Sequence, residues 1–180
     1  MLAVRAGEMP ALRELYLRYY DRARYYFYRM QGRDEELARD LAQDLFVRIA
    51  QKAHYFEPSR SFSTWFFSIA HNMCKNRYRH KEVKERAHEE IAAKQALWVE
   101  AERHTLEAMQ SLQFRDALEE VLKSLSTEKK TAFLLRYREN WGVKEIAEVL
   151  ELPEGTVKSR LFYTLKDIAK TLQAFNPQKI

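Results

Sequence analysis

Residues 156–166 contain many side chains that suit contact with DNA, interspersed with apolar ones. Lysine and arginine bind phosphates, serine binds phosphates or base edges, and aromatic rings fill a groove. These side chains stand off a stripe of apolar residues at helical spacing, which are Val157, Leu161, Leu165 and Ile168. A helix over this segment would bury the apolar stripe and present the polar and aromatic side chains to nucleic acid.

Two short helices joined by a tight turn are predicted to position this surface. The first helix has apolar residues at three- and four-residue spacing, which are Ile146, Ala147 and Leu150. Pro153 lacks an amide hydrogen and disfavours helical angles at the preceding residue, so it places the turn there. We expect Gly155 to take unusual backbone angles and Thr156 to cap the second helix through its hydroxyl. This pattern is a helix-turn-helix, whose second helix lies in the major groove in many DNA-binding proteins.

A helix-turn-helix also occurs in proteins that do not bind DNA, so the residues that make up the motif are needed to decide its function. The run LPEGTVKSRL at residues 152–161 resembles the promoter-reading helix of bacterial RNA polymerase sigma factors, specifically the extracytoplasmic-function group. The run FSTWFFSIAHN at residues 62–72 resembles the family's second conserved region, and residues 40–46 resemble its acidic helix that docks on the polymerase core. The resemblance covers about residues 5–90 and 112–172. It implies a subunit that directs core RNA polymerase to promoters and helps to open the DNA.

By this resemblance, the second helix of the motif reads the closed minus-thirty-five element. Lys158 and Ser159 match positions that face bases and phosphates, and Phe162 matches an aromatic that contacts thymine methyl groups. Residues 163–165 depart from the family, in which arginines are common there, so phosphate contacts and base preference should change. The candidate residues are Thr156, Lys158, Ser159, Arg160, Phe162, Tyr163 and Lys166.

Two further positions of this motif need separate readings. Arg160 is expected to contact either a phosphate or another part of the chain. Glu151 occupies a turn position that is often glycine in the family, so the chain should enter the turn in a slightly different way.

Residues 56–79 combine three kinds of group that hold single-stranded bases: rings for stacking, polar groups for base edges, and positive charge. Phe62, Trp65 and Phe66 are the candidate rings, although helical spacing favours a place in the core for at least Trp65. By resemblance, the loop at residues 57–63 would form a pocket for a flipped base of the minus-ten element. The candidate residues are Arg60, Ser61, Phe62, Ser63, Trp65, Asn72, Lys75, Asn76 and Arg79.

An acidic segment in the first half presents two carboxylates one helical turn apart, Asp40 and Asp44. Paired carboxylates can perform acid–base catalysis, but no metal ligand or proton donor lies near them in the sequence. By resemblance they form a docking surface for core RNA polymerase. The candidate residues are Asp40, Gln43, Asp44 and Arg48.

Composition narrows the remaining function classes. The net charge of +5 fits a nucleic-acid partner, and the single cysteine, Cys74, excludes an internal disulfide. We find no Cys/His spacing for a zinc site, so neither a metal nor another cofactor is expected. Without a secretory signal or a long uncharged apolar run, the protein should be soluble and cytoplasmic, with no insertion into a membrane.

The predicted fold is all-α, because the chain of 180 residues has only four Gly and four Pro and is rich in helical periodicity. We expect two small helical domains: a sigma region 2-like bundle at residues 1–90 and a sigma region 4-like helix-turn-helix domain at residues 112–175. A partly helical linker at residues 91–111 would join them.

Local signals predict several helix ends. Pro10 suits a first turn, and Gly32 ends that helix. Asp34 should cap the next helix, and a loop at residues 54–63 should precede a helix from Thr64 to about residue 86. Ser126 or Thr127 should cap a helix that runs to about residue 139.

Two other functions compete with a sigma factor. A stand-alone helix-turn-helix regulator would bind an operator as a symmetric dimer, but it has no need for an aromatic loop followed by a basic helix. A nuclease would need metal ligands or an activated nucleophile, and neither can be found. We therefore expect no enzymatic activity. By resemblance, core RNA polymerase, promoter DNA and an anti-sigma factor are the expected partners.

Overall fold

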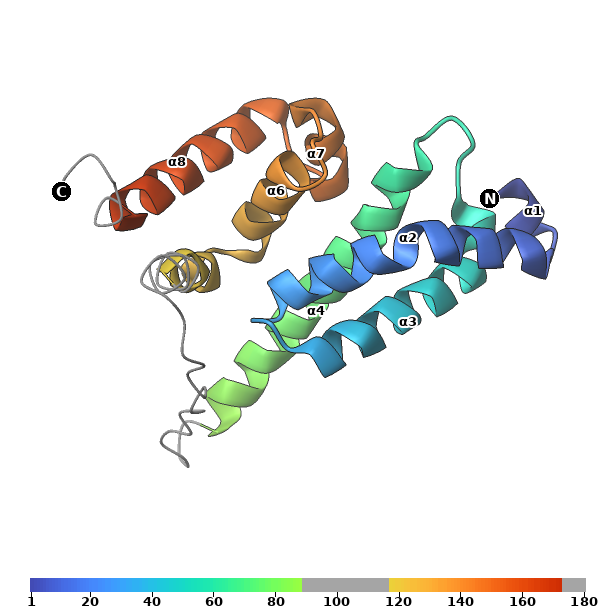
Figure 1. Cartoon of the computed structure of the whole chain (residues 1–180), viewed down its shortest axis with the longest axis horizontal. Coiled ribbons are helices and arrows are strands. Elements are labelled where there is room, and N and C mark those ends of the chain that lie inside the picture. Colours follow the sequence, from blue (N-terminus) through green and yellow to red (C-terminus); the bar gives the residue numbers. More distant parts are fainter. Residues whose placement is uncertain (89–116, 173–180) are drawn as a thin grey trace, which may run out of the picture.

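The computed structural model describes residues 1–88 and 117–172, with the backbone alone for residues 81–88, and each regular element in these ranges is a helix (Figure 1). The N-terminal half contains α1 (Leu2–Arg5), α2 (Met9–Met30), α3 (Glu35–Gln51), a 3₁₀ turn (Ala53–Tyr55) and α4 (Phe62–His88). The C-terminal half contains a helix at residues 117–124, α6 (Thr127–Tyr137), α7 (Val143–Leu150) and α8 (Glu154–Leu172). The all-α prediction is confirmed for the described part of the chain. The linker predicted at residues 91–111 lies outside it.

Helix ends follow the predicted capping signals. The Asp34 carboxylate accepts a hydrogen bond from the Leu37 amide at 2.9 Å, and α3 begins at the next residue, Glu35. The Ser126 hydroxyl accepts a hydrogen bond from the Lys129 amide at 3.4 Å, at the start of α6. Both caps satisfy an amide that has no partner within its own helix.

The long helix α4 begins two residues before the predicted start at Thr64. The Trp65 amide donates to the Ser61 carbonyl at 3.2 Å, which is the first helical bond of α4. Phe62 and Ser63 are therefore part of the helix, and the exposed loop between the 3₁₀ turn and α4 is shorter than expected. The loop keeps Arg60 and Ser61 at its C-terminal end, immediately before the ring cluster of α4.

The turn between α7 and α8 differs from the prediction in two ways. The left-handed residue is Glu151, with φ 54° and ψ 45°, whereas Gly155 lies in the first turn of α8. Thr156 is also inside α8, where its amide donates to the Pro153 carbonyl at 2.9 Å, so it is not the cap. The predicted cap was wrong because Pro153, which lacks an amide hydrogen, permits the helix to start immediately after it.

Glu151→Gly is expected to stabilise the fold by about 1 kcal/mol, because glycine adopts the left-handed conformation without the steric cost of a Cβ. Urea denaturation measures this change. Glu151→Ala is the matched control, since it removes the same carboxylate and keeps the Cβ. Equal stabilities of the glycine and alanine variants would show that backbone conformation contributes nothing at this position.

The buried stripe of α8 also differs at one residue. Thr164 is fully buried, while Leu165 exposes 41% of its surface. A helix advances about 100° per residue, so the positions seven and eleven residues after Val157 share its face and the position eight residues after it turns away. The stripe is therefore Val157, Leu161, Thr164 and Ile168.

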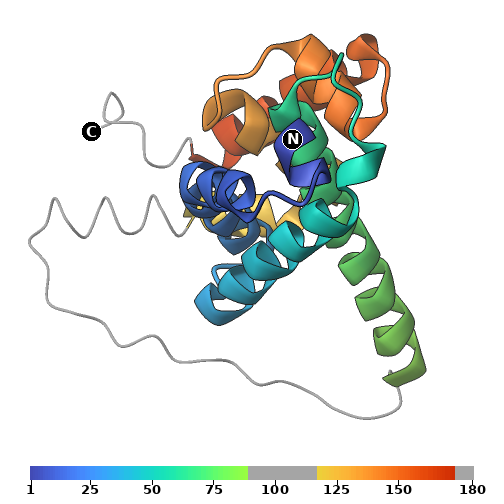
Figure 2. The same ribbon diagram turned by 90° about the vertical axis from the view of Figure 1, so that its right-hand side faces the viewer.

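One hydrophobic core runs through both halves. Figure 2 shows the helices of the C-terminal half lying against those of the N-terminal half. Phe27, Phe66 and Phe67 are fully buried in the N-terminal half. The Phe67 ring meets Trp141 of the other half edge to face, with 5.4 Å between ring centroids. Helix α7 packs against α4, so the first helix of the helix-turn-helix rests on the N-terminal bundle.

Polar and charged contacts accompany this apolar junction. The Tyr26 hydroxyl lies 2.8 Å from the Thr131 hydroxyl, which is also 3.1 Å from Nδ1 of His71. At the rim, Nε of Arg22 donates to the Glu139 carboxylate at 2.8 Å. These contacts join α2 and α4 to α6 and to the residues that follow it. They fix the relative orientation of the two halves.

Candidate nucleic-acid interface

The outward face of α8 presents most of the residues predicted to read duplex DNA. Lys158, Ser159 and Lys166 are exposed, and Phe162 and Tyr163 expose 63% and 54% of their surfaces. Helices α6 and α7 hold this face outward by packing against the opposite, buried stripe of α8. The structure therefore leaves the predicted reading surface open to solvent.

Arg160 makes an intramolecular contact instead of projecting outward. Its Nη1 lies 4.0 Å from the Glu128 carboxylate, and 29% of its side chain is exposed. Of the two expectations for this residue, the structure supports the contact within the chain. Thr156 is half-buried at the first turn of the same helix.

The loop before α4 is exposed, and a cluster of rings lies directly behind it. Phe62 and Trp65 are half-buried, with 6.2 Å between their ring centroids, and Phe56 lies 5.3 Å from Trp65. Phe66, by contrast, is fully buried in the core. The expectation that Phe66 supplies a stacking ring is therefore wrong, because its ring points into the core, where it packs against Tyr19 of α2 and Phe46 of α3.

The serines at the end of the loop and in the first turn of α4 differ in whether their hydroxyls are free to contact a base. Ser61 is exposed, whereas the Ser63 hydroxyl lies 2.9 Å from the Tyr19 hydroxyl. Arg60 is exposed and pairs with Glu57 at 3.2 Å. Tyr19 comes from α2, so no local pattern around the loop could have pointed to it; only the packing of α2 on α4 brings it there.

A polar row continues from the loop along α4. Asn72, Lys75, Asn76 and Arg79 are exposed and lie three or four residues apart, which places them on one face of the helix. The inward face holds Cys74, and burial raises the pKa of its thiol to about 12. Cys74 is therefore an inert packing residue, while the opposite face carries hydrogen-bonding groups and positive charge.

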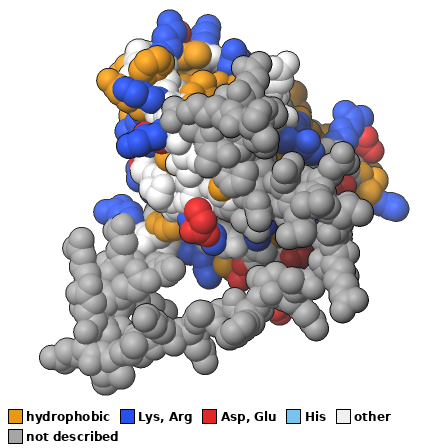
Figure 3. Space-filling model, turned by 60° about the vertical axis from the view of Figure 1, so that its left-hand side comes forward, with side chains coloured by type: hydrophobic (Ala, Val, Ile, Leu, Met, Phe, Trp, Pro, Cys, Tyr) orange, Lys and Arg blue, Asp and Glu red, His pale blue; other side chains and the backbone are white. Residues whose placement is uncertain are grey.

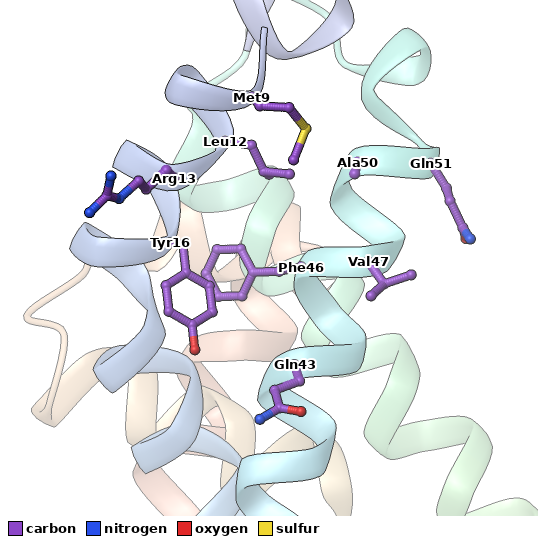
Figure 4. A pocket seen from close by; sticks show the side chains of 9 residues that line it. All are labelled: Met9, Leu12, Arg13, Tyr16, Gln43, Phe46, Val47, Ala50 and Gln51. Carbon is purple, nitrogen blue, oxygen red and sulfur yellow. The ribbon is translucent and has the colours of Figure 1, made fainter. Parts of the chain in front are cut away.

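The predicted docking residues share the exposed face of α3. Asp40, Gln43, Asp44 and Arg48 are all exposed. Gln43 also borders an apolar pocket of about 480 Å³ between α2 and α3 (Figure 4). Val47 also lines the pocket and is 55% exposed. The predicted docking residues are all polar or charged, so they did not include it.

His71 lies under the junction of the two halves. Burial lowers its pKa from 6.5 to about 4, with Lys75 and Arg160 acting in the same direction and Glu128 opposing them. The ring is therefore neutral at pH 7 and can share a hydrogen bond with the Thr131 hydroxyl. Protonation would place an unpaired charge in the core.

Folding stability should fall by about 2 kcal/mol between pH 7 and pH 4.5 because of His71 alone. Since its pKa is lower in the folded protein, the unfolded chain binds the proton first, and stability is lost as the pH falls below 6.5. Urea denaturation at both pH values measures the loss. His71→Gln cannot titrate, so its pH dependence should be shallower by that amount; identical dependence in both proteins would contradict the assignment.

Neither a metal site nor a membrane span is found within residues 1–88 and 117–172. No group of three or more His, Cys, Asp or Glu side chains is arranged to hold a metal ion there. No helix in those ranges combines the length and apolar character needed to cross a bilayer.

Two family models match the two halves in order. Sigma-70 region 2 matches residues 15–83, and Sigma-70, region 4 matches residues 115–168. The chain is 31% identical to the RNA polymerase sigma-H factor of Pseudomonas aeruginosa, over 78% of this chain and 75% of that protein. It is 29% identical to the ECF RNA polymerase sigma factor SigW of Bacillus subtilis, over 94% of this chain and 93% of that protein.

Solved structures share the fold. The sigma factor RpoE of Bartonella quintana, in complex with the anti-sigma factor NepR, superposes with a TM-score of 0.68 at 19% identity, over 89% of this chain and 96% of that one. CnrH, in complex with the cytosolic domain of CnrY, gives 0.67 at 21% identity, over 96% and 94%. With both regions present in order, the chain belongs to the extracytoplasmic-function group of the sigma-70 family of RNA polymerase sigma factors.

Proposed function

We propose that this sigma factor directs core RNA polymerase to promoters by reading two DNA elements with two different surfaces, and that the polymerase supplies all catalysis. One observation carries the proposal: the α8 face suits a closed duplex, whereas the loop and ring cluster of α4 suit unpaired bases. A stand-alone regulator would need only the first surface. Since RNA polymerase acts on the chromosome, this function places the protein in the cytoplasm.

The α8 face would bind the minus-thirty-five element in the major groove. An α-helix fits that groove, and exposed lysines at both ends of the face supply charge for phosphates. Lys158, Ser159, Phe162, Tyr163 and Lys166 are exposed there. Arg160 would support this surface from within, through its contact with Glu128.

The loop and ring cluster would hold bases of the minus-ten element after the strands separate. Ring stacking is worth about 1–3 kcal/mol per base, and positive charge along α4 can follow the phosphate backbone. Phe62 and Trp65 are the partly exposed rings, with Arg60 and Ser61 beside them and the polar row of α4 beyond. Ser63 would orient the cluster through its bond to Tyr19.

The two halves must separate for both elements to be read at once. Elements centred about 25 base pairs apart lie roughly 85 Å apart along B-form DNA, whereas a compact chain of this length has a radius of gyration of about 16 Å. The continuous core through Phe67 and Trp141 therefore belongs to a closed state. Residues 89–116 would connect the halves in the open state.

Core RNA polymerase would open the chain by docking on α3. Asp40, Gln43, Asp44 and Arg48 offer it an exposed charged face. An anti-sigma factor is the expected antagonist, since RpoE and CnrH, which share the fold, were solved with protein partners, in the case of RpoE the anti-sigma factor NepR. Such a partner would act by holding the closed state.

Energy transfer between dyes on Glu36→Cys and Lys170→Cys tests this opening, because both positions are exposed and the native Cys74 is buried. Transfer should be high in the free protein and fall when core polymerase and promoter DNA are added. Asp44→Arg should prevent the fall, whereas Asp21→Arg, an exposed reversal on α2, should not. High transfer in the transcribing complex would exclude opening.

A further inference from the structure

The reading face of α8 carries more apolar surface than a solvated helix needs. Phe162, Tyr163 and Leu165 expose 63%, 54% and 41% of their surfaces. The two rings touch, with 5.4 Å between centroids, and Leu165 follows Phe162 by three residues, which places it next to Phe162 on the helix. Nothing in the described parts of the chain covers these side chains.

Groups that identify bases by hydrogen bonds are scarce on the same face. Arginine reads guanine and Asn or Gln reads adenine through paired hydrogen bonds. Arg160 is turned toward Glu128, and Ser159 donates its hydroxyl hydrogen to the Thr156 carbonyl at 2.9 Å. From residue 158 to residue 166, the exposed donors with no partner of this kind are Lys158, Lys166 and the hydroxyl of Tyr163. None of the three has the planar pair of hydrogen-bonding groups with which Arg, Asn and Gln read a base.

Charge around the apolar side chains points to DNA as the occupant. Lys158, Phe162 and Lys166 lie four residues apart in succession, so they form one row along the helix with a cation at each end. In Figure 3 hydrophobic and basic side chains lie side by side at the top of the molecule, over the helix-turn-helix half. Cations that bracket an apolar patch suit a groove walled by phosphates.

The major groove offers one apolar group to such a patch, the C5 methyl of thymine. We infer that Tyr163 and Leu165, together with Phe162, determine specificity by packing on thymine methyl groups of the minus-thirty-five element. Where an arginine would favour guanine, these side chains favour thymine. The inference rests on the proposed function and adds the base class that this particular sigma factor selects.

Deoxyuridine substitution isolates the methyl group, because deoxyuridine pairs like thymidine and lacks only that methyl. The holoenzyme is mixed with promoter duplexes in which each minus-thirty-five thymine is replaced in turn, and affinity is measured by fluorescence anisotropy. At one or more positions the loss should be about fourfold, the factor expected for one buried methyl-sized group. A second pair of duplexes carries cytosine or 5-methylcytosine at the same position. These two differ only in the C5 methyl, so a gain in affinity with 5-methylcytosine measures the same contact by adding the methyl.

Alanine variants assign each methyl to a side chain. Phe162→Ala, Tyr163→Ala and Leu165→Ala remove exposed groups, so the fold and core binding should be retained. A variant that has lost the reading side chain should bind the thymine and deoxyuridine duplexes equally at the matching position, while Lys170→Ala, a change at an exposed position one turn further along α8, should still distinguish them.

Three results would overturn the inference. Equal affinity for thymine and deoxyuridine at every position, with specific promoter binding intact, would refute methyl readout and leave the sigma function standing. Weaker association with core polymerase in the alanine variants, with unchanged discrimination, would show that the patch docks on protein. No specific binding of any duplex by the holoenzyme would refute both the inference and the proposed function.

Discussion

Lys158→Glu is expected to weaken promoter binding by the holoenzyme by about 10- to 100-fold. Lys158 is exposed at the N-terminal part of α8, the region of a recognition helix that enters the groove, and the substitution replaces a phosphate-binding cation with a repelled anion. The slope of log affinity against log salt should also become shallower by about one phosphate contact. Binding to a promoter duplex over a range of salt concentrations measures both effects.

The matched control is Lys123→Glu, which makes the same reversal in the same half of the protein. Lys123 is exposed on the helix at residues 117–124 and pairs with Glu120 at 2.6 Å, away from the α8 face. Its variant should bind the promoter as the wild type does. If both reversals weaken binding equally, the effect belongs to net charge and not to the recognition helix.

Trp65→Ala is expected to lower the fraction of opened promoter by about tenfold. The factor is that expected when one base loses its stacking ring, or when the ring cluster that holds the base is lost. Trp65 is half-buried between Phe56 and Phe62, so the substitution removes both a candidate stacking surface and part of its support. Permanganate oxidation of unpaired thymines in the minus-ten region measures opening directly. Closed-complex affinity, which depends on α8, should change little.

Trp65→Phe separates stacking from folding, because it keeps a ring in the cluster. We expect it to restore most of the opening, and we expect the alanine variant to remain folded because α4 is anchored by the buried Phe66 and Phe67. A melting temperature that collapses in Trp65→Ala, together with loss of closed-complex binding, would assign Trp65 to the core alone.

Local chemistry made much of the fold predictable. The caps at Asp34 and Ser126 and the helix-turn-helix are set by residues within a few positions of each other, and the structure confirms them. The gathering of rings, serines and basic residues before and along α4 was also visible in the sequence, while their role in holding unpaired bases stays a prediction. Which ring is buried did not follow, because Trp65 and Phe66 differ by only one helical step and both are aromatic.

Contacts between the halves were beyond sequence reasoning. Phe67 and Trp141 meet across many residues, as do His71 and Thr131, and no periodicity links such distant positions. The same limit hid Tyr19, which reaches Ser63 only because α2 packs on α4. At Leu165 the error had a simpler cause: an apolar residue was assigned to the buried stripe, although helical rotation gives that place to Thr164.

The measurement that tests the central claim most directly is transcription from fragmented chromosomal DNA of a bacterium that encodes the protein. Core RNA polymerase is supplied with or without the sigma factor, and RNA 5′ ends are mapped by sequencing. The account predicts new start sites that depend on the protein, with two shared elements upstream and with the Lys158→Glu and Trp65→Ala variants impaired at them. Start sites unchanged by the protein, with specific binding of the isolated chain to DNA as a dimer, would contradict it and identify a stand-alone regulator.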